Sequence, residues 1–150
     1  MTGHLELVRV GDWEARLNAL LAQRRDVLFT WGATDCCMFA ADAVLAMTGV
    51  DAAAEFRGRY TTAGGAARAL KRHGAGELAA TIDAKFESVA PAFVRRGDLV
   101  AVDHDALGTA IGVCIGADAV FVGLEAGEDG DTPGLVRVPR AGWRSGWRVG

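Results

Sequence analysis

The sequence has few of the residues that cross-link or interrupt a chain: it contains three cysteines and three prolines, and two of the cysteines are adjacent. Such cysteines do not form a disulfide framework, so we expect synthesis in a reducing compartment, with thiols that are buried or catalytic. They also lack the CxxC spacing of zinc sites, and no HxH or HExxH motif accompanies them. We therefore expect neither a metal nor a cofactor.

Long apolar runs and an excess of positive charge are also missing. No run reaches membrane-spanning length, and the N-terminus, with His4, Glu6 and Arg9, lacks the layout of a signal peptide. The net charge of −3 gives no electrostatic reason to expect nucleic acid or an anionic membrane as a partner. The basic residues are expected on a solvated surface, scattered among acids: Arg9, Arg24, Arg25, Arg68, Lys71, Arg72, Arg95 and Arg96.

What the chain does contain is enough apolar side chains for a core, since 51% of its residues are hydrophobic and 23% are charged. A chain of this size buries roughly two-thirds of its unfolded surface. We expect a single domain over residues 1–150, with a short N-terminal arm at about 1–11 and a Trp/Arg-rich segment at about 141–150.

Helical patterns fill the first half of the chain and strand patterns the second. Helices are predicted at 13–25, 36–48, 66–72 and 77–84, and short strands at 99–102, 110–115, 119–122, 135–138 and 147–149. Helices followed by strands is the order of an α+β protein and not of alternating βαβ units. The predicted fold is a set of N-terminal helices packed on a C-terminal antiparallel β-meander.

One stretch, from Trp31 to Phe39, joins a turn to the start of a buried helix. Asp35 is a good N-cap, so Cys36 is predicted in the first turn of a helix that Gly49 ends. The helix dipole and unpaired N–H groups there favour a thiolate, which suits a nucleophile. The alternative is that Cys36 and Cys37 are small core residues. Only one of them can face a cleft, because helical neighbours are rotated by about 100°.

The order of motifs resembles the NlpC-like (papain-like) cell-wall cysteine peptidases, and in particular the small, divergent relatives found among bacteriophage tail genes. The matching residues are WG…DC…F from Trp31 to Phe39, then Gly97-Asp98-Leu99-Val100, then Ala110-Ile111-Gly112-Val113-Cys114-Ile115-Gly116. The resemblance covers roughly residues 29–122. It implies that Cys36 takes the place of the nucleophile and Asp98 that of the acid at the entry of a strand.

The sequence departs from this family at the catalytic base. The family's strand typically reads His-Val-Gly-Ile-Tyr-Ile-Gly, and Ala110 stands where its histidine belongs. General acid–base help of this kind is worth roughly 10²–10⁴-fold in rate. His104, between Asp103 and Asp105, is a candidate for a relocated base or an ordinary polar turn residue. His4 and His73 are expected to be solvated.

Three further segments have alternative interpretations. Trp143-Arg144 and Trp147-Arg148 either lay their indoles on the sheet or form a contact patch, since Trp and Arg are common at interface hot spots. The acidic segment 123–134 is a solvated turn or a docking element. Residues 62–66 contain two glycines before a helix but lack the pattern of a phosphate loop, so a flexible helix entry is expected.

The resemblance implies a structural component of a tailed phage or prophage. In this interpretation the chain is a tail-tip or baseplate-hub protein of the virion tail, assembled in the host cytoplasm. Its inherited cleft is degenerate, and the fold acts as a rigid adaptor between hub, distal tail and fibre proteins. The alternative is an active cysteine hydrolase that cuts peptide cross-links of peptidoglycan, with Cys36 as nucleophile and His104 or a partner's residue as base. A host cytosolic thiol protein is a third class.

Overall fold

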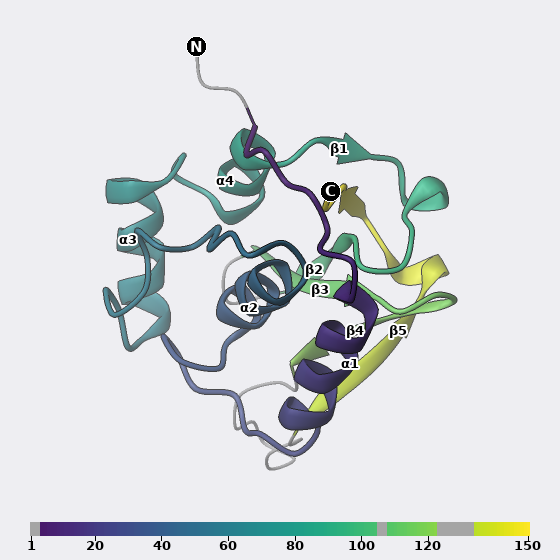
Figure 1. The fold of residues 1–150 in the computed structure, drawn as a ribbon. Helices are drawn as coiled ribbons and strands as arrows, with labels where there is room; N and C mark the ends of the chain where they lie inside the picture. The colour runs from purple at the N-terminus through teal and green to yellow at the C-terminus, as the bar shows by residue number, and fades with distance from the viewer. Residues whose placement is uncertain (1–3, 105–107, 123–133) are drawn as a thin grey trace.

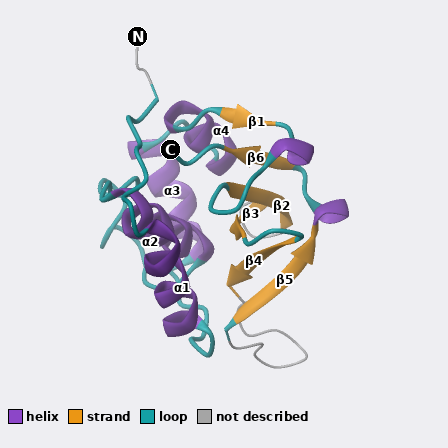
Figure 2. Ribbon diagram, turned by 45° about the vertical axis from the view of Figure 1, so that its right-hand side comes forward, coloured by secondary structure: helices purple, strands orange, loops and turns teal. Residues whose placement is uncertain are grey.

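The structure, a computed structural model, describes residues 4–104, 108–122 and 134–150. Within these residues four α-helices form one layer, and six strands form an antiparallel sheet. Figures 1 and 2 show the helices gathered on one side of the sheet. The predicted α+β class is confirmed.

The helices lie close to where the hydrophobic patterns predicted them. Their bounds are α1 Trp13–Arg24, α2 Cys36–Thr48, α3 Ala63–His73 and α4 Leu78–Lys85. The helix α2 packs against both α1 and the sheet, and Phe39 and Val44 on it are fully buried. The helix α3 begins three residues before its predicted start, because the Thr62 hydroxyl accepts a hydrogen bond from the N–H of Gly65 and caps the helix there.

The strands form one sheet, but they are not a simple meander. Their bounds are β1 Ser88–Val89, β2 Leu99–His104, β3 Gly108–Cys114, β4 Asp118–Val122, β5 Leu135–Pro139 and β6 Ser145–Trp147, in the spatial order β1-β6-β2-β3-β4-β5. Strands β2 to β5 follow one another as predicted. The last strand instead returns to lie between β1 and β2, where Trp147 pairs with Ser88 on one side and Leu99 on the other. The meander prediction therefore needs this correction.

The sheet buries side chains on both faces, and strand alternation assigns each residue to a face. Leu99, Ala101, Ile111 and Val113 belong to the main core, which includes the buried residues of the helices. The opposite face carries a second cluster made of Val94, Val100, Cys114, Ala119, Phe121 and Trp143. Odd-numbered residues of β2 and β3 therefore face the helices, and even-numbered residues face away from them.

Asp98, at the entry of β2, joins both ends of the chain. Its carboxylate is fully buried and accepts hydrogen bonds from Arg9 Nη2 at 3.0 Å and from Arg148 Nη1 at 3.1 Å. It also accepts one from the N–H of Val149 at 3.0 Å. The acid predicted at the strand entry is thus occupied in closing the fold. Figure 1 shows the arm and the C-terminus close together.

The N-terminal arm lies along the helices without joining the sheet. The N–H of Leu5 donates to the carbonyl of Lys85, and the N–H of Val10 donates to the carbonyl of Met47, both at 2.8 Å. No helix in the described ranges has both the length and the hydropathy needed to cross a bilayer. The predicted acidic segment 123–134 lies outside the described residues except for Gly134, which donates a hydrogen bond to the carbonyl of Val27.

Candidate functional site

The turn before α2 is built around the buried carboxylate of Asp35. Its Oδ1 accepts the N–H of Met38 at 2.9 Å, and its Oδ2 accepts the N–H of Gly32 at 2.7 Å. The first of these bonds confirms the predicted N-cap, which satisfies one of the donors that the start of a helix leaves unpaired. Gly49 ends the helix in the left-handed conformation, also as predicted.

Tyr60 completes this turn, a role that no sequence motif indicates beyond the presence of an aromatic ring with a polar end. Its hydroxyl donates to Asp35 Oδ2 at 2.7 Å, and the residue is buried. Burial, followed by the nearby Cys37 and Asp35, raises the pKa of Tyr60 far above its ordinary value. Gly32 is required opposite it, because its φ is +83° and a Cβ there would overlap the carbonyl oxygen of Tyr60.

Cys36 opens α2 with its sulfur against the sheet. The residue is 7% exposed, and Ile111 of β3 lies beside it. The neighbouring Cys37 thiol, followed by the backbone N–H groups of Ile111 and Cys37, holds the pKa of Cys36 below its ordinary value. The lowered pKa expected of a thiol at a helix start is therefore present, but the Cys36 side chain is almost completely shielded from solvent.

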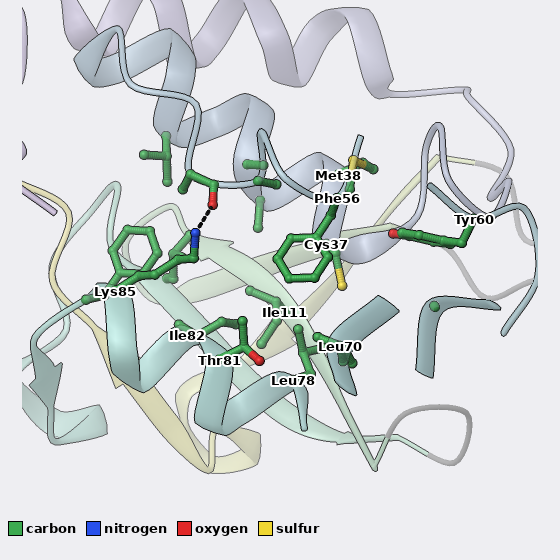
Figure 3. Close-up of a pocket in the computed structure, with 18 residues that line it drawn as sticks. Cys37, Met38, Phe56, Tyr60, Leu70, Leu78, Thr81, Ile82, Lys85 and Ile111 are labelled. Atoms are coloured by element: carbon green, nitrogen blue, oxygen red, sulfur yellow. Dashed lines mark hydrogen bonds between the residues drawn. The ribbon is translucent and has the colours of Figure 1, made fainter. Parts of the chain in front are cut away.

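Cys37 borders an internal cavity whose described lining does not include Cys36. Figure 3 shows its sulfur among Phe56, Leu70 and Ile111, in an apolar cavity of about 70 Å³ between α2, α3, α4 and the sheet. The hydrogen bond to Cys36 and burial raise the pKa of the Cys37 thiol well above its ordinary value. Ligand pockets have about 300–1,000 Å³, so this cavity has room for a small apolar group at most.

The structure does not bring His104 to Cys36. His104 is the last residue of β2 and pairs with Gly108 in a ladder whose register is regular from Leu99 onwards. It therefore shares the sheet face of Val100 and Val102, which is turned away from α2. The structure therefore does not bring His104 and Cys36 together on one face of the sheet.

The other two histidines also lie elsewhere, and all three histidines of the sequence are within the described residues. The ring of His4, on the arm, is 3.2 Å from the carbonyl oxygen of Asp83. His73 ends α3, with its ring edge-on to Phe56 at 6.3 Å between centroids. This chain thus supplies no imidazole to the Cys36 sulfur.

Ala110 lies on the same outer face as His104. It packs against the second cluster, whereas its neighbour Ile111 belongs to the main core and contacts Cys36. Gly112, next on that face, allows the ring of Phe121 to pack where a Cβ would stand. A histidine at position 110 would therefore point away from α2. Position 110, where the resemblance implies the family's histidine, thus lies on the face opposite to that of Cys36.

Residues 8–149 match the model of a protein family described as a domain of unknown function, DUF6950. The chain belongs to this family. No curated protein matches the sequence. The matched range includes Arg9 and Val149, so the DUF6950 unit contains both chain ends that Asp98 holds together.

The two C-terminal tryptophans of this DUF6950 domain are core residues. Trp143 is 6% exposed and Trp147 is 1% exposed. Their indole N–H groups donate to the carbonyl of Val138 at 2.9 Å and to Oδ1 of Asp83 at 2.7 Å, respectively. Trp147 is enclosed because β6 lies between β1 and β2, and Trp143 is enclosed because it packs in the second cluster. Neither indole is exposed in this chain, and both pack on the sheet.

The two arginines beside them have different surroundings. Arg148 is bound to the buried Asp98, so it closes the fold with Val149. Arg144 is exposed and pairs with the exposed Asp103 at 2.9 Å. Of the four predicted contact residues, Arg144 alone remains on the surface. Among the residues that the structure describes, no three His, Cys, Asp or Glu side chains are grouped so that they could hold a metal ion.

Proposed function

We propose that this DUF6950 domain is a structural component of a phage tail tip or baseplate hub. It keeps an NlpC-like (papain-like) fold and serves in the virion tail as an adaptor between hub and fibre proteins. The observation that carries the proposal is the environment of Cys36, whose sulfur contacts a backbone N–H and a second thiol in a closed position. A helix opened by a cysteine and packed on an antiparallel sheet supports the fold assignment.

The positions of the histidine and of the buried carboxylates support a structural role for this domain. A cysteine hydrolase needs a base within hydrogen-bonding reach of its thiol. In this chain His104 lies on the sheet face opposite to that of Cys36. General acid–base help is worth roughly 10²–10⁴-fold, so its loss leaves little chemistry. The acids that precede Cys36 and Leu99, namely Asp35 and Asp98, are buried and bound within the fold.

Rigidity is what an adaptor requires, and buried carboxylates supply it here. Asp98 ties the arm and the C-terminus to β2, and Asp35 ties the 58–62 loop to α2. A third carboxylate, Asp42 on α2, pairs with Arg24 of α1 and with Arg57. Each of these bonds joins segments that are distant in sequence, so the relative positions of the elements are fixed.

Composition of purified virus particles tests the proposal. We expect mass spectrometry of particles from a strain that carries the gene to detect this chain in the tail fraction. A Cys36→Ala chain should be incorporated equally well, because the proposed role does not use the thiol. Absence of the wild-type chain from purified tails would overturn the proposal.

The second candidate is the cysteine hydrolase that cleaves peptidoglycan cross-links, and the lowered pKa of Cys36 favours it. Its base would have to come from another chain. Incubation with muropeptides separates the two functions, with Cys36→Ala as the test variant and Cys114→Ala, in the second cluster on the other face of the sheet, as the matched control. Cleavage that only Cys36→Ala abolishes would replace the adaptor with the hydrolase.

A further inference from the structure

The outer side of α3 and the loop before it form a hollow of about 950 Å³ with a strongly basic lining. We call it the α3 hollow. Its charged lining consists of Arg59, Arg68, Lys71 and Arg72, together with His73. No acidic residue lines the part of it that the structure describes. The sequence predicted Arg68, Lys71 and Arg72 to be scattered among acids, and the fold instead gathers them with Arg59.

The four permanent cations of the α3 hollow are exposed, and none of them belongs to an ion pair found in the described residues. Arg68 is three and four residues before Lys71 and Arg72, a spacing at which like charges on a helix repel by a few tenths of a kcal/mol. The fold therefore keeps an uncompensated positive cluster in a chain whose net charge is −3.

Helix electrostatics explain only part of this cluster. Lys71, Arg72 and His73 occupy the last turn of α3, where cations suit the helix dipole. Arg68 lies earlier in the helix, and Arg59 lies on the preceding loop. The helix dipole does not account for the positive charge that these two side chains add to the hollow. We therefore infer that this charge serves to bind an external anion.

The backbone at the start of α3 is not the receptor. Thr62 Oγ1 accepts the N–H of Gly65 at 3.0 Å, so the helix start is already capped from within. Recognition thus falls to the guanidinium and ammonium groups. Guanidinium groups bind carboxylates through paired hydrogen bonds, which makes an arginine-rich hollow well suited to several carboxylates.

We propose that the α3 hollow binds an acidic segment of a partner protein. The inference rests on the proposed adaptor function for the partner being a protein. Nucleic acid is the less fitting polyanion, because Tyr60, the one Phe, Tyr or Trp in the described lining, is buried and its hydroxyl is bound to Asp35. Single-stranded nucleic acid is held by aromatic stacking as well as by charge. The net negative charge of the whole chain also repels a long polyanion.

Fluorescence anisotropy of a labelled hexaglutamate peptide with the full chain tests the proposal. At about 50 mM salt, where charge contacts are weakly screened, we expect saturable binding. The variant Arg68→Glu/Arg72→Glu should weaken it by at least about 10-fold, because two charge-assisted contacts are reversed. The matched control is Arg16→Glu/Arg137→Glu, which makes the same charge change at exposed arginines outside the hollow and should weaken binding by less than about 2-fold. Circular dichroism checks that both variants are folded.

Three results would overturn the inference: no binding of the peptide, equal weakening by the control variant, or tighter binding of an oligothymidylate of the same charge. Incorporation into tails separates the inference from the function on which it rests. A wild-type chain that enters tails but ignores the peptide contradicts the inference alone. A chain that binds the peptide through the hollow but is absent from tails contradicts the adaptor function alone.

Discussion

The hydroxyl of Tyr60 donates a 2.7 Å hydrogen bond to Oδ2 of Asp35, and this bond joins the 58–62 loop to the start of α2. Both residues are buried, and Asp35 has no exposed surface. The same carboxylate caps α2 and holds the turn at Gly32. The residue immediately before Cys36 therefore has a structural task, as Asp98 does at the entry of β2.

As pH is raised, Tyr60 should lose its proton only when the protein unfolds. Its raised pKa contributes stability that is fully present below the ordinary tyrosine pKa of about 10 and is lost as pH rises above it. Tyr60 is the only tyrosine, so any tyrosinate absorbance near 295 nm comes from it, and a Tyr60→Phe variant measured in parallel supplies the absorbance of the four tryptophans. We expect tyrosinate absorbance to rise together with the loss of helical circular dichroism. Tyrosinate that forms near pH 10 while the protein is still folded would contradict the burial of Tyr60 and its hydrogen bond to Asp35.

Gly32→Ala should destabilise the protein much more than Gly49→Ala. Both glycines have a left-handed φ, +83° and +79°. Alanine in that region costs roughly 1–2 kcal/mol by itself. At Gly49 the added Cβ meets open space, whereas at Gly32 it overlaps the carbonyl of Tyr60. Urea unfolding of the two variants measures the difference, and equal losses would show that the turn does not hold Tyr60 as described.

Asp98→Asn should be strongly destabilising, by about 3–5 kcal/mol, because it leaves two partly buried arginines without their counter-charge. The expected result in urea unfolding is a lower midpoint. The control is Asp12→Asn, at an exposed ion pair with Arg16, which should barely change the midpoint. Similar midpoints for the two variants would contradict the claim that Asp98 stabilises the fold by holding the two chain ends together.

Local signals predicted much of the fold. Asp35 and Gly49 bound α2 as their capping preferences indicate, and short apolar runs located β2 to β5. The strand β1 was missed because two residues carry no alternation. The place of β6 depends on the pairing of Trp147 with Leu99, a contact between distant residues that no local pattern specifies.

The site was harder to predict, because motif order does not fix which face of a sheet a residue takes. A shift of one residue moves a side chain to the other face, and that is how Ala110 and His104 come to lie away from Cys36. Adjacent cysteines raise the same difficulty, since Cys37 and not Cys36 borders the cavity. The α3 hollow depends on the fold bringing Arg59 beside α3.

Alkylation of Cys36 by iodoacetamide, mapped by mass spectrometry near neutral pH, tests the central claim most directly. Because the residue is 7% exposed and lies against Ile111, the reagent should reach it only through opening of the structure. We predict a rate at least about 10²-fold below that of the unfolded chain, unchanged in His104→Ala. Alkylation as fast as that of an exposed, activated thiol, and slowed by His104→Ala, would contradict the account.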